Sequence, residues 1–401
     1  MNILMIHQHY FPEMSGTARR TRELSESFVN MNHRVSVITS FPREFRSIPG
    51  VKCRPFEIRN DVRVHRIKTL FEVKNNVFLR LLAYMAFVLQ SIVLAIRLSK
   101  KSDIVISVAP ISSGIIGSFV KIINKKHHHF DVPDILPDLG ISAGMIKNRL
   151  IISFLFKLER WVYDHADTVS AITLGQIDNI HGKGVAKSKL FYIPDWIDDT
   201  FFKKNLKKYK DEVTRMLKST DKKLISFVGN IGALQNPVIF IEMMASLQAD
   251  NMDEFQFLFI GDGIMLPKLK ENVKSIGLKN VEFVGRVKRE YIPAYMHLSD
   301  ILVANYLPNN YMDICIPGKL FEYAISNKPI IMGARGEAKK LIEKYLLGIA
   351  VQPSNVATFK KAILQISNGS YIYNPKTDKF IQDFSLRKIA RLYNNIFQKV
   401  I

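Results

Sequence analysis

Short apolar runs alternate with amphipathic stretches along the whole chain. Residues 3–6 and 103–107 are mostly apolar and bounded by polar residues, which is typical of parallel strands buried on both faces. The stretch with Leu24 and Phe28 on one side carries charged residues on the other and predicts a helix. A strand, a glycine-containing loop and a helix, followed by another strand, form a βαβ unit. The pattern therefore predicts an α/β fold.

A second series of this kind follows a polar, lysine-rich stretch. Its strands are expected at 224–228, 255–260, 281–284 and 300–304, each followed by a glycine-containing or polar loop. We place the linker near Asp198, which predicts domains at 1–197 and 198–380 and a carboxyl-terminal helix at 381–401 that packs back toward the first domain. Ligands of open α/β sheets bind outside the carboxyl ends of the strands, so two such domains facing each other would enclose a cleft.

The stretch 316–331, IPGKLFEYAISNKPII, combines a turn, a helix start and a polar pair. Its apolar positions predict a helix that begins after Pro317-Gly318, with Lys319 and Glu322 one turn apart on the other face. A helix start with a glycine suits a phosphate group, and Glu322 can accept hydrogen bonds from a ribose. The alternative is that Glu322 only complements the helix dipole and Lys319 is solvated.

Composition adds a bias toward anionic partners. The 401 residues carry a net charge of +21 and are 47% hydrophobic, which suits two globular domains that bind nucleotide phosphates, nucleic acid or an anionic membrane. The two cysteines, Cys53 and Cys315, are far apart, so we expect neither a disulfide framework nor a cysteine metal site. The first eleven residues lack the pattern of a signal peptide, and we expect a cytoplasmic protein.

The most apolar stretch is 81–96, LLAYMAFVLQSIVLAI. Its 16 residues are few for a membrane span, which needs about 20. Basic residues flank it, namely Arg80, Arg97, Lys100 and Lys101. An apolar helix with basic flanks is typical of a helix that is buried or lies in the lipid headgroup layer, so we expect peripheral attachment to the inner face of the cytoplasmic membrane.

Histidines and aspartates lie close together at 127–138. Three consecutive histidines on a strand cannot all face one metal ion, because successive side chains point to opposite faces, so we expect a structural or surface role for them. Asp131, Asp134 and Asp138 follow this strand among prolines, where carboxylates can face a cleft or simply form turns. No Asp-x-Asp occurs in the chain, so a closely spaced carboxylate pair for a metal ion is missing and no metal site is expected.

Several motifs recur in a fixed order. The second half carries GNIG at 229, GDG at 261, VGRV at 284, a strand opening with Ser-Asp at 299, and PGKLFEY ahead of NKPII; the first half carries YFPEMSGTARRTREL, DVPDILPD, LERWVYDHAD and YIPDWID. This series resembles family-4 retaining glycosyltransferases of the GT-B fold, with two Rossmann-like domains, and looks closest to the bacterial O-antigen and capsule branch that includes N-acetyl-L-fucosaminyl transferases. The resemblance covers nearly the whole chain.

The resemblance implies roles for individual residues. Asp134 matches the acceptor-side polar residue and, with Glu322, is the expected catalytic pair; Glu322 matches the glutamate that holds the donor ribose. The implied donor-binding residues are Gly16, Gly229, Asn230, Arg286, Lys288, Gly318, Lys319 and Glu322, and the acceptor-side residues are Asp131, Asp134 and Asp138. Two positions depart from the family: Ile314 stands where a first glutamate is common, and Pro133 where an arginine often precedes the aspartate.

The function implied is transfer of a sugar from a nucleotide sugar, UDP-linked, to a lipid-linked saccharide, without metal or other cofactor. Cleavage of a glycosyl–phosphate bond develops negative charge on the diphosphate, which Lys319 and a basic residue of the VGRVKR loop would stabilise. One alternative is a hydrolysing UDP-N-acetylglucosamine 2-epimerase on the same fold. Another is a basic membrane- or nucleic-acid-binding protein without catalysis, although no nucleic-acid-binding motif is present and no nucleic-acid partner is expected.

Overall fold

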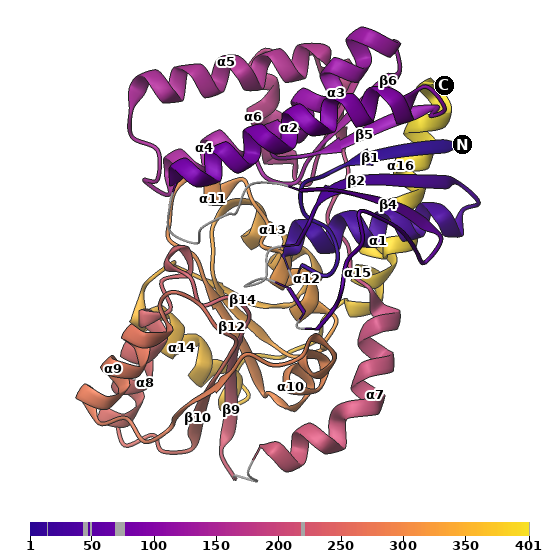
Figure 1. Cartoon of the computed structure of the whole chain (residues 1–401). Coiled ribbons are helices and arrows are strands. Elements are labelled where there is room, and N and C mark those ends of the chain that lie inside the picture. The colour runs from indigo at the N-terminus through magenta and orange to yellow at the C-terminus, as the bar shows by residue number, and fades with distance from the viewer. Residues whose placement is uncertain (14, 43–46, 49, 69–76, 218–220, 401) are drawn as a thin grey trace. The chain divides into compact units, whose positions relative to one another are not determined.

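The structure is a computed structural model of the chain and describes residues 1–13, 15–42, 47–48, 50–68, 77–217 and 221–400. The chain divides into two compact units. Unit 1 comprises Met1–Asp195 together with Leu386–Ile401, and unit 2 comprises Trp196–Ser385. The chain therefore leaves unit 1 once and returns to it with its last helix, α16 (Figure 1).

Unit 1 is built on an eight-stranded sheet in the order β3-β4-β2-β1-β5-β6-β7-β8, parallel except for β3, which pairs antiparallel with β4 at one edge. The strands are β1 (Asn2–Ile6), β2 (Arg34–Ser40), β3 (Phe56–Arg59), β4 (Val62–Ile67), β5 (Ile104–Val108), β6 (His127–Val132), β7 (Thr168–Ala171) and β8 (Leu190–Tyr192). The central strands are buried on both faces, as their apolar runs predict.

Helices cover both faces of this sheet. They are α1 (Gly16–Asn30), α2 (Val77–Ser99), α3 (Ile111–Asn124), α4 (Leu136–Ser142), α5 (Arg149–His165), α6 (Leu174–Gly182) and α16 (Leu386–Val400), with a 3₁₀ turn at Lys187–Lys189. On one face, Phe87 of α2 and Ile116 of α3 pack in a core with Leu4 and Ile6 of β1. Elsewhere in the unit, Phe28 of α1 packs against Tyr393 and Phe397 of α16, and the two helices lie side by side in Figure 1.

Unit 2 is built on a six-stranded parallel sheet in the order β11-β10-β9-β12-β13-β14. The strands are β9 (Lys223–Val228), β10 (Phe255–Ile260), β11 (Val281–Gly285), β12 (Ile301–Asn305), β13 (Ile330–Gly333) and β14 (Gly348–Val351). Alternate residues of the strands face two separate cores. In β12, for example, Leu302 and Ala304 belong to one core and Val303 to the other.

The helices of unit 2 fill both cores. They are α7 (Asp199–Met216), α8 (Val238–Ala249), α9 (Leu266–Ile276), α10 (Ile292–Leu298), α11 (Asn310–Asp313), α12 (Gly318–Ala324), α13 (Gly336–Tyr345), α14 (Val356–Ser367) and α15 (Thr377–Phe384), with 3₁₀ turns at Ala233–Gln235 and Arg289–Tyr291. The lysine-rich stretch placed around the linker folds as α7, because its Phe202 and Val213 are buried in one of these cores. The predicted α/β class is confirmed in both units.

The helix expected at 81–96 forms as part of α2. Within the described ranges, no helix is both long and apolar enough to cross a membrane. The side chain of Arg80 lies outside the described part of the chain.

Candidate active site

The strand order gives each sheet a point where the direction of winding reverses. In unit 2, β10 and β11 lie on one side of β9, and β12, β13 and β14 lie on the other. In unit 1, the corresponding neighbours are β1 and β5. Ligands of open parallel sheets bind outside the carboxyl ends of the strands at such a switch point. Both switch points are therefore candidate binding sites.

At the switch point of unit 2, backbone hydrogen bonds, most of them from glycines, connect the loops after β9, β10 and β11. The backbone N–H of Gly229 donates to Ile260, that of Gly261 donates to Gly285, and that of Ile231 donates to Asp262. Gly261 has φ +140°, and a Cβ there would collide with the carbonyl oxygen of Gly229. Only glycine fits at this crossing, so the loop that begins at Gly229 is held rigid at the end of β9.

Lys319 lies on α12, a helix between β12 and β13, and its side chain points toward this switch point. Its Nζ lies 3.8 Å from the ring centroid of Phe227 in β9 and 5.9 Å from that of Tyr306, which follows β12. A Cβ on Gly229 would lie 3.5 Å from the same nitrogen. The structure thus brings together two residues that are 90 positions apart in the sequence.

The amine of Lys319 is buried and has no hydrogen-bond partner among the described residues. Burial lowers the pKa of this amine from 10.5 to about 7, and the carboxylate of Glu322, one turn further along α12, opposes the shift. The alternative that Lys319 is solvated is therefore wrong for its amine. A buried cation without a counter-ion is costly, and an anionic group bound beside Gly229 would supply the missing partner.

The other predicted donor-binding residues of unit 2 lie on α12 and in the loops after β9 and β11. Glu322 is partly exposed on α12, while Gly318 and Asn230 are exposed. Arg286 and Lys288 are exposed in the loop after β11. Since β11 is two strands from β9, this loop starts about 10 Å from the end of β9 along the sheet edge. Arg286 and Lys288 would therefore contact a part of a long ligand other than the part beside Lys319. Arg289 lies over the ring of Phe201, 4.5 Å from its centroid.

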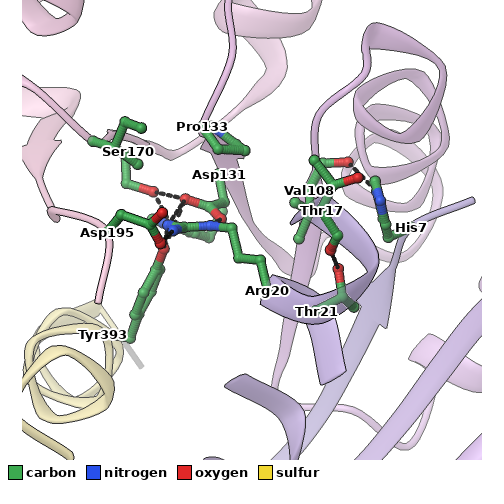
Figure 2. A network of polar contacts seen from close by, with 12 residues as sticks. His7, Thr17, Arg20, Thr21, Val108, Asp131, Pro133, Ser170, Asp195 and Tyr393 are labelled. Carbon is green, nitrogen blue, oxygen red and sulfur yellow. Dashed lines mark hydrogen bonds and ion pairs between the residues drawn. The ribbon is translucent and has the colours of Figure 1, made fainter. Parts of the chain in front are cut away.

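In unit 1, Asp131 lies at the centre of a buried polar network (Figure 2). Arg20 of α1 donates to it from Nε (2.9 Å) and Nη2 (3.2 Å), and the hydroxyls of Ser170 (2.8 Å) and Tyr393 (2.7 Å) donate as well. Arg20 also donates to Asp195 (3.1 Å). Burial would raise the pKa of Asp131, but the charge and hydrogen bonds of Arg20 outweigh burial and lower it. Both carboxylate oxygens already accept hydrogen bonds, so Asp131 stabilises the structure around the site and is not available to a ligand.

Asp134 differs from Asp131 although it is three residues away. It is partly exposed and makes no hydrogen bond or ion pair with any residue that the structure describes. Burial raises the pKa of its carboxyl, and the charge of Asp195 raises it further against the opposing effect of Arg20. A carboxylate with a raised pKa and no partner is available to a ligand hydroxyl.

Asp138 and Gly16 complete the predicted residues of unit 1. Asp138 forms an ion pair with Lys183, which also pairs with Glu159 at 2.8 Å. Its carboxylate therefore ties α4 to the α5–α6 region. Gly16 is exposed at the start of α1, and a Cβ there would meet no atom within 4 Å, so the space above it is open.

The three consecutive histidines have the structural role expected for them. The Nε2 of His128 bonds the Ser107 hydroxyl at 2.6 Å, and His129 bonds Thr168 and Ser170, each at 2.9 Å. Burial lowers the pKa of His128 to about 4 and that of His129 to about 3. No group of three or more metal-ligating residues was found in the part of the chain that the structure describes.

Sequence reasoning missed Arg20, Asp195 and Tyr393. Arg20 lies four residues before Leu24 and eight before Phe28, so it shares the apolar face of α1. A charged residue on the apolar face of a helix indicates a buried ion pair, so the sequence does contain a signal for the role of Arg20. Tyr393 carries a similar signal as a polar tip on the apolar face of α16.

Comparisons with known proteins match both units. The model of the glycosyl transferase 4-like domain matches residues 15–196, and that of glycosyl transferases group 1 matches residues 222–368. The putative colanic acid biosynthesis glycosyl transferase WcaI of Escherichia coli (strain K12) is 25% identical over 415 residues, covering 100% of this chain and 99% of the relative.

One further relative and one solved structure have a ligand or substrate in their descriptions. A Campylobacter jejuni enzyme described as GalNAc-alpha-(1->4)-GalNAc-alpha-(1->3)-diNAcBac-PP-undecaprenol alpha-1,4-N-acetyl-D-galactosaminyltransferase is 25% identical over 163 residues, covering 41% of this chain and 44% of that enzyme. The crystal structure of Anabaena HepE in complex with UDP superposes with a TM-score of 0.74 at 14% identity, covering 100% of both chains. A likeness at this identity shows the fold, and it confirms the predicted GT-B fold with two Rossmann-like domains.

The two family matches span most of the chain, one on each unit, and the two sheets have the topology of that fold. The prediction that this protein is an enzyme of the transferase class is confirmed. The chain is a group 1 glycosyltransferase with a glycosyl transferase 4-like amino-terminal domain.

Proposed function

We propose that this enzyme transfers a sugar, with retention of configuration, from a UDP-sugar to a lipid-linked saccharide in the synthesis of a surface polysaccharide such as O-antigen or capsule. Unit 2 binds the donor and unit 1 binds the acceptor. The observation that carries the proposal is the buried, unpartnered amine of Lys319 beside Gly229 at the switch point of unit 2. An N-acetyl-L-fucosaminyl donor group is the subtype that the sequence motifs favour.

The donor diphosphate binds beside Lys319. As the glycosyl–phosphate bond breaks, negative charge grows on the diphosphate, and a fixed ammonium stabilises it more strongly in a buried site than in water. Arg286 and Lys288, in the loop after β11, extend the positive field along the sheet edge. Glu322 accepts hydrogen bonds from the ribose hydroxyls. These basic side chains take the part that a divalent metal has in other transferases.

The acceptor hydroxyl binds at Asp134. Its carboxylate has no partner among the described residues and a raised pKa, which suits a group that orients a hydroxyl or removes its proton. Asp131 and Asp138 act through the fold, because Arg20 and Lys183 occupy their carboxylates. The activity for which the Campylobacter relative is named, on an undecaprenol diphosphate-linked saccharide, supports a lipid-linked acceptor.

We also propose that unit 1 attaches to the inner face of the cytoplasmic membrane. On α2, Met85, Leu89 and Val93 recur every four residues and are 48%, 68% and 72% exposed. On α5, Leu150 and Phe154 are 81% and 62% exposed. The basic residues of these helices and of the turns beside them include Arg97, Lys100, Lys101, Lys147, Arg149 and Lys157. Exposed apolar stripes with basic neighbours fit an anionic lipid surface.

Lipid binding is tested by sedimentation with vesicles that contain anionic lipid. The double substitution Leu89→Ser with Phe154→Ser should reduce the bound fraction, and high salt should reduce it further. Ile372→Ser is the control, because Ile372 is 86% exposed in unit 2. Equal binding of the control and the double variant would contradict attachment through these helices.

The donor half of the proposal is tested by thermal shift with UDP-, GDP- and dTDP-sugars. A ligand at 100 times its dissociation constant stabilises the folded state by about 2.7 kcal/mol. Stabilisation by a UDP-sugar, and transfer of its labelled sugar to a membrane lipid extract, are the expected results. Release of a free epimerised sugar without transfer would instead identify a hydrolysing epimerase, and no nucleotide binding at all would leave a non-catalytic binding protein.

A further inference from the structure

The switch point of unit 1 contains buried polar atoms that the roles assigned above leave unused. Among the described residues, several buried side-chain atoms without a hydrogen-bond partner follow β1 and β5: His7 Nε2 and Gln8 Oε1 after β1, and the hydroxyls of Ser112 and Ser113 after β5. Neighbouring strands place these residues together, because Ile6 pairs with Ser107 in the parallel ladder. Most buried polar groups in proteins are paired, so such a concentration indicates a missing partner.

His7 is held in one orientation by its neighbours. Its Nδ1 lies 3.1 Å from the carbonyl oxygen of Val108 in β5 (Figure 2). Because a carbonyl oxygen can only accept, Nδ1 carries the proton and Nε2 presents a lone pair. Burial lowers the pKa of His7 to about 3, so the ring is neutral at physiological pH.

Gln8 is also fixed, through its backbone. Its carbonyl oxygen accepts hydrogen bonds from the Ser40 N–H (3.0 Å), the Thr39 hydroxyl (3.0 Å) and the Ser40 hydroxyl (2.7 Å), all at the end of β2. The two residues are therefore anchored on opposite sides of β1, His7 to β5 and Gln8 to β2. An acceptor atom that is already held in place, such as Nε2 of His7, loses little entropy when it binds a ligand.

The chemistry of these atoms selects the ligand. A neutral imidazole lone pair and an amide oxygen both accept hydrogen bonds, and both repel an anion. The serine hydroxyls can donate or accept. A phosphate needs donors or positive charge, whereas a sugar hydroxyl or an acetamido N–H donates. Asp134 follows β6, which pairs with β5, so it lies at the same edge of the sheet as these atoms, two strands from β1.

We propose that His7 and Gln8 form a subsite that accepts hydrogen bonds from a neutral, hydroxyl-bearing sugar at the switch point of unit 1. This inference rests on the proposed function, since the sugar is the acceptor saccharide whose reacting hydroxyl lies at Asp134. It adds the class of group recognised: hydrogen-bond donors of a sugar ring, and not the diphosphate of the lipid carrier.

Two substitutions of His7 separate the two ring nitrogens. Asparagine can keep the hydrogen bond that Nδ1 makes to Val108 while removing the acceptor at Nε2. Glutamine places an amide near Nε2 and can keep the acceptor there. Ligand-observed NMR on the full chain with saturating UDP, using a panel of neutral methyl pyranosides and inorganic phosphate as probes, compares wild type, His7→Asn and His7→Gln.

At least one pyranoside should bind the wild type, bind His7→Asn about five- to tenfold more weakly, and bind His7→Gln within about twofold of the wild type. A monodeoxy pyranoside that lacks the recognised hydroxyl should bind wild type and His7→Asn equally, which a merely structural role of His7 would not produce. If His7→Asn fails to fold, Gln8→Leu, which removes the other acceptor at similar volume, takes its place.

The inference is overturned if no pyranoside binds the wild type, if His7→Asn binds like the wild type, or if phosphate competes for the site. UDP affinity, measured on the same samples, distinguishes failure of the subsite from failure of the proposed function. UDP binding and sugar transfer with no effect of His7→Asn would overturn the subsite alone. Absence of UDP binding would overturn the donor site, whatever the pyranosides do.

Discussion

The two units share a topology but present opposite chemistry where their winding reverses. At the switch point of unit 2, the ends of β9 and β12 enclose the amine of Lys319, which has no partner among the described residues. At the switch point of unit 1, the ends of β1 and β5 carry the acceptor atoms of His7 and Gln8, and the buried cation nearby, Arg20, is already paired with Asp131 and Asp195. One sheet end is thus ready for an anion, and the other for a neutral hydrogen-bond donor.

This difference teaches that the strand order fixes where a ligand binds, while a few side chains fix its charge. A neutral sugar alone would not neutralise the unpaired cation in unit 2. A fully ionised phosphate has no proton to donate to the hydrogen-bond acceptors in unit 1 and would be repelled by them. A nucleotide sugar and a saccharide acceptor differ in this respect. The proposed division of labour between the units therefore rests on charge, before any assignment of individual contacts.

The largest effect is expected from Asp134→Asn. Removing a carboxylate that activates a hydroxyl should lower turnover by about 10² to 10⁴ while UDP affinity stays nearly unchanged, because the residue belongs to unit 1. Sugar transfer and nucleotide titration measure the two quantities separately. Asp178→Asn, at an exposed position of helix α6, is the matched control and should behave like wild type. Lost UDP affinity in Asp134→Asn would break the division between the units.

Asp131→Asn should act through stability instead. The carboxylate is fully buried and paired with Arg20, and loss of one partner of a buried ion pair typically costs about 3 to 5 kcal/mol. We expect a large fall in the denaturation midpoint of Asp131→Asn and little change for Asp134→Asn. Equal midpoints for the two variants would show that Asp131 is not the structural member of the pair.

Lys319→Met should separate activity from stability. Loss of the ammonium should reduce kcat/KM by about 10² to 10³, as for removal of one preorganised group that stabilises developing charge. The free protein should nevertheless melt a few degrees higher, since an apolar side chain replaces a buried, unpartnered amine. Calorimetry without nucleotide checks this. A lower melting temperature would mean that Lys319 supports the fold rather than the ligand.

Much of the fold could be predicted from the sequence, because buried parallel strands consist of short apolar runs and the helices have an amphipathic pattern of apolar and polar residues. Two residues of the proposed donor site were predictable for a similar reason: Gly229 and Lys319 lie in local motifs next to a strand. The network of Asp131 was not, since its partners Arg20 and Tyr393 are 111 and 262 positions away and no local pattern joins them. The free acceptor of His7 was not either, because it depends on which ring nitrogen Val108 occupies.

A smaller effect is expected from Glu322→Gln. The substitution keeps size and helix propensity but removes the charge that accepts hydrogen bonds from ribose hydroxyls, and a hydrogen bond to a charged group contributes about 1.5 to 3 kcal/mol. We expect weaker binding of UDP, while binding of inorganic diphosphate, which lacks a ribose, stays unchanged. Equal losses for both ligands would return Glu322 to a purely electrostatic role at the start of α12.

The smallest effect over a single pH unit, and the sharpest in sign, is the pH dependence carried by Lys319. Burial holds the pKa of this amine at about 7 in the free protein, so between pH 7 and 10 it is neutral when folded and charged when unfolded. The unfolded state then binds more protons, and stability should rise with pH in this window by at most about 1.4 kcal/mol per pH unit.

Nucleotide affinity should move the other way over the same window. The diphosphate prefers the charged amine, so binding takes up a proton, and the dissociation constant for UDP should rise by at most about tenfold per pH unit above pH 7. Lys319→Met is the control for both trends, because the other titrating groups remain in it. Opposite slopes in the wild type that flatten together in Lys319→Met would show that one amine sets both. Parallel slopes would mean that the charge needed at the switch point of unit 2 comes from another residue.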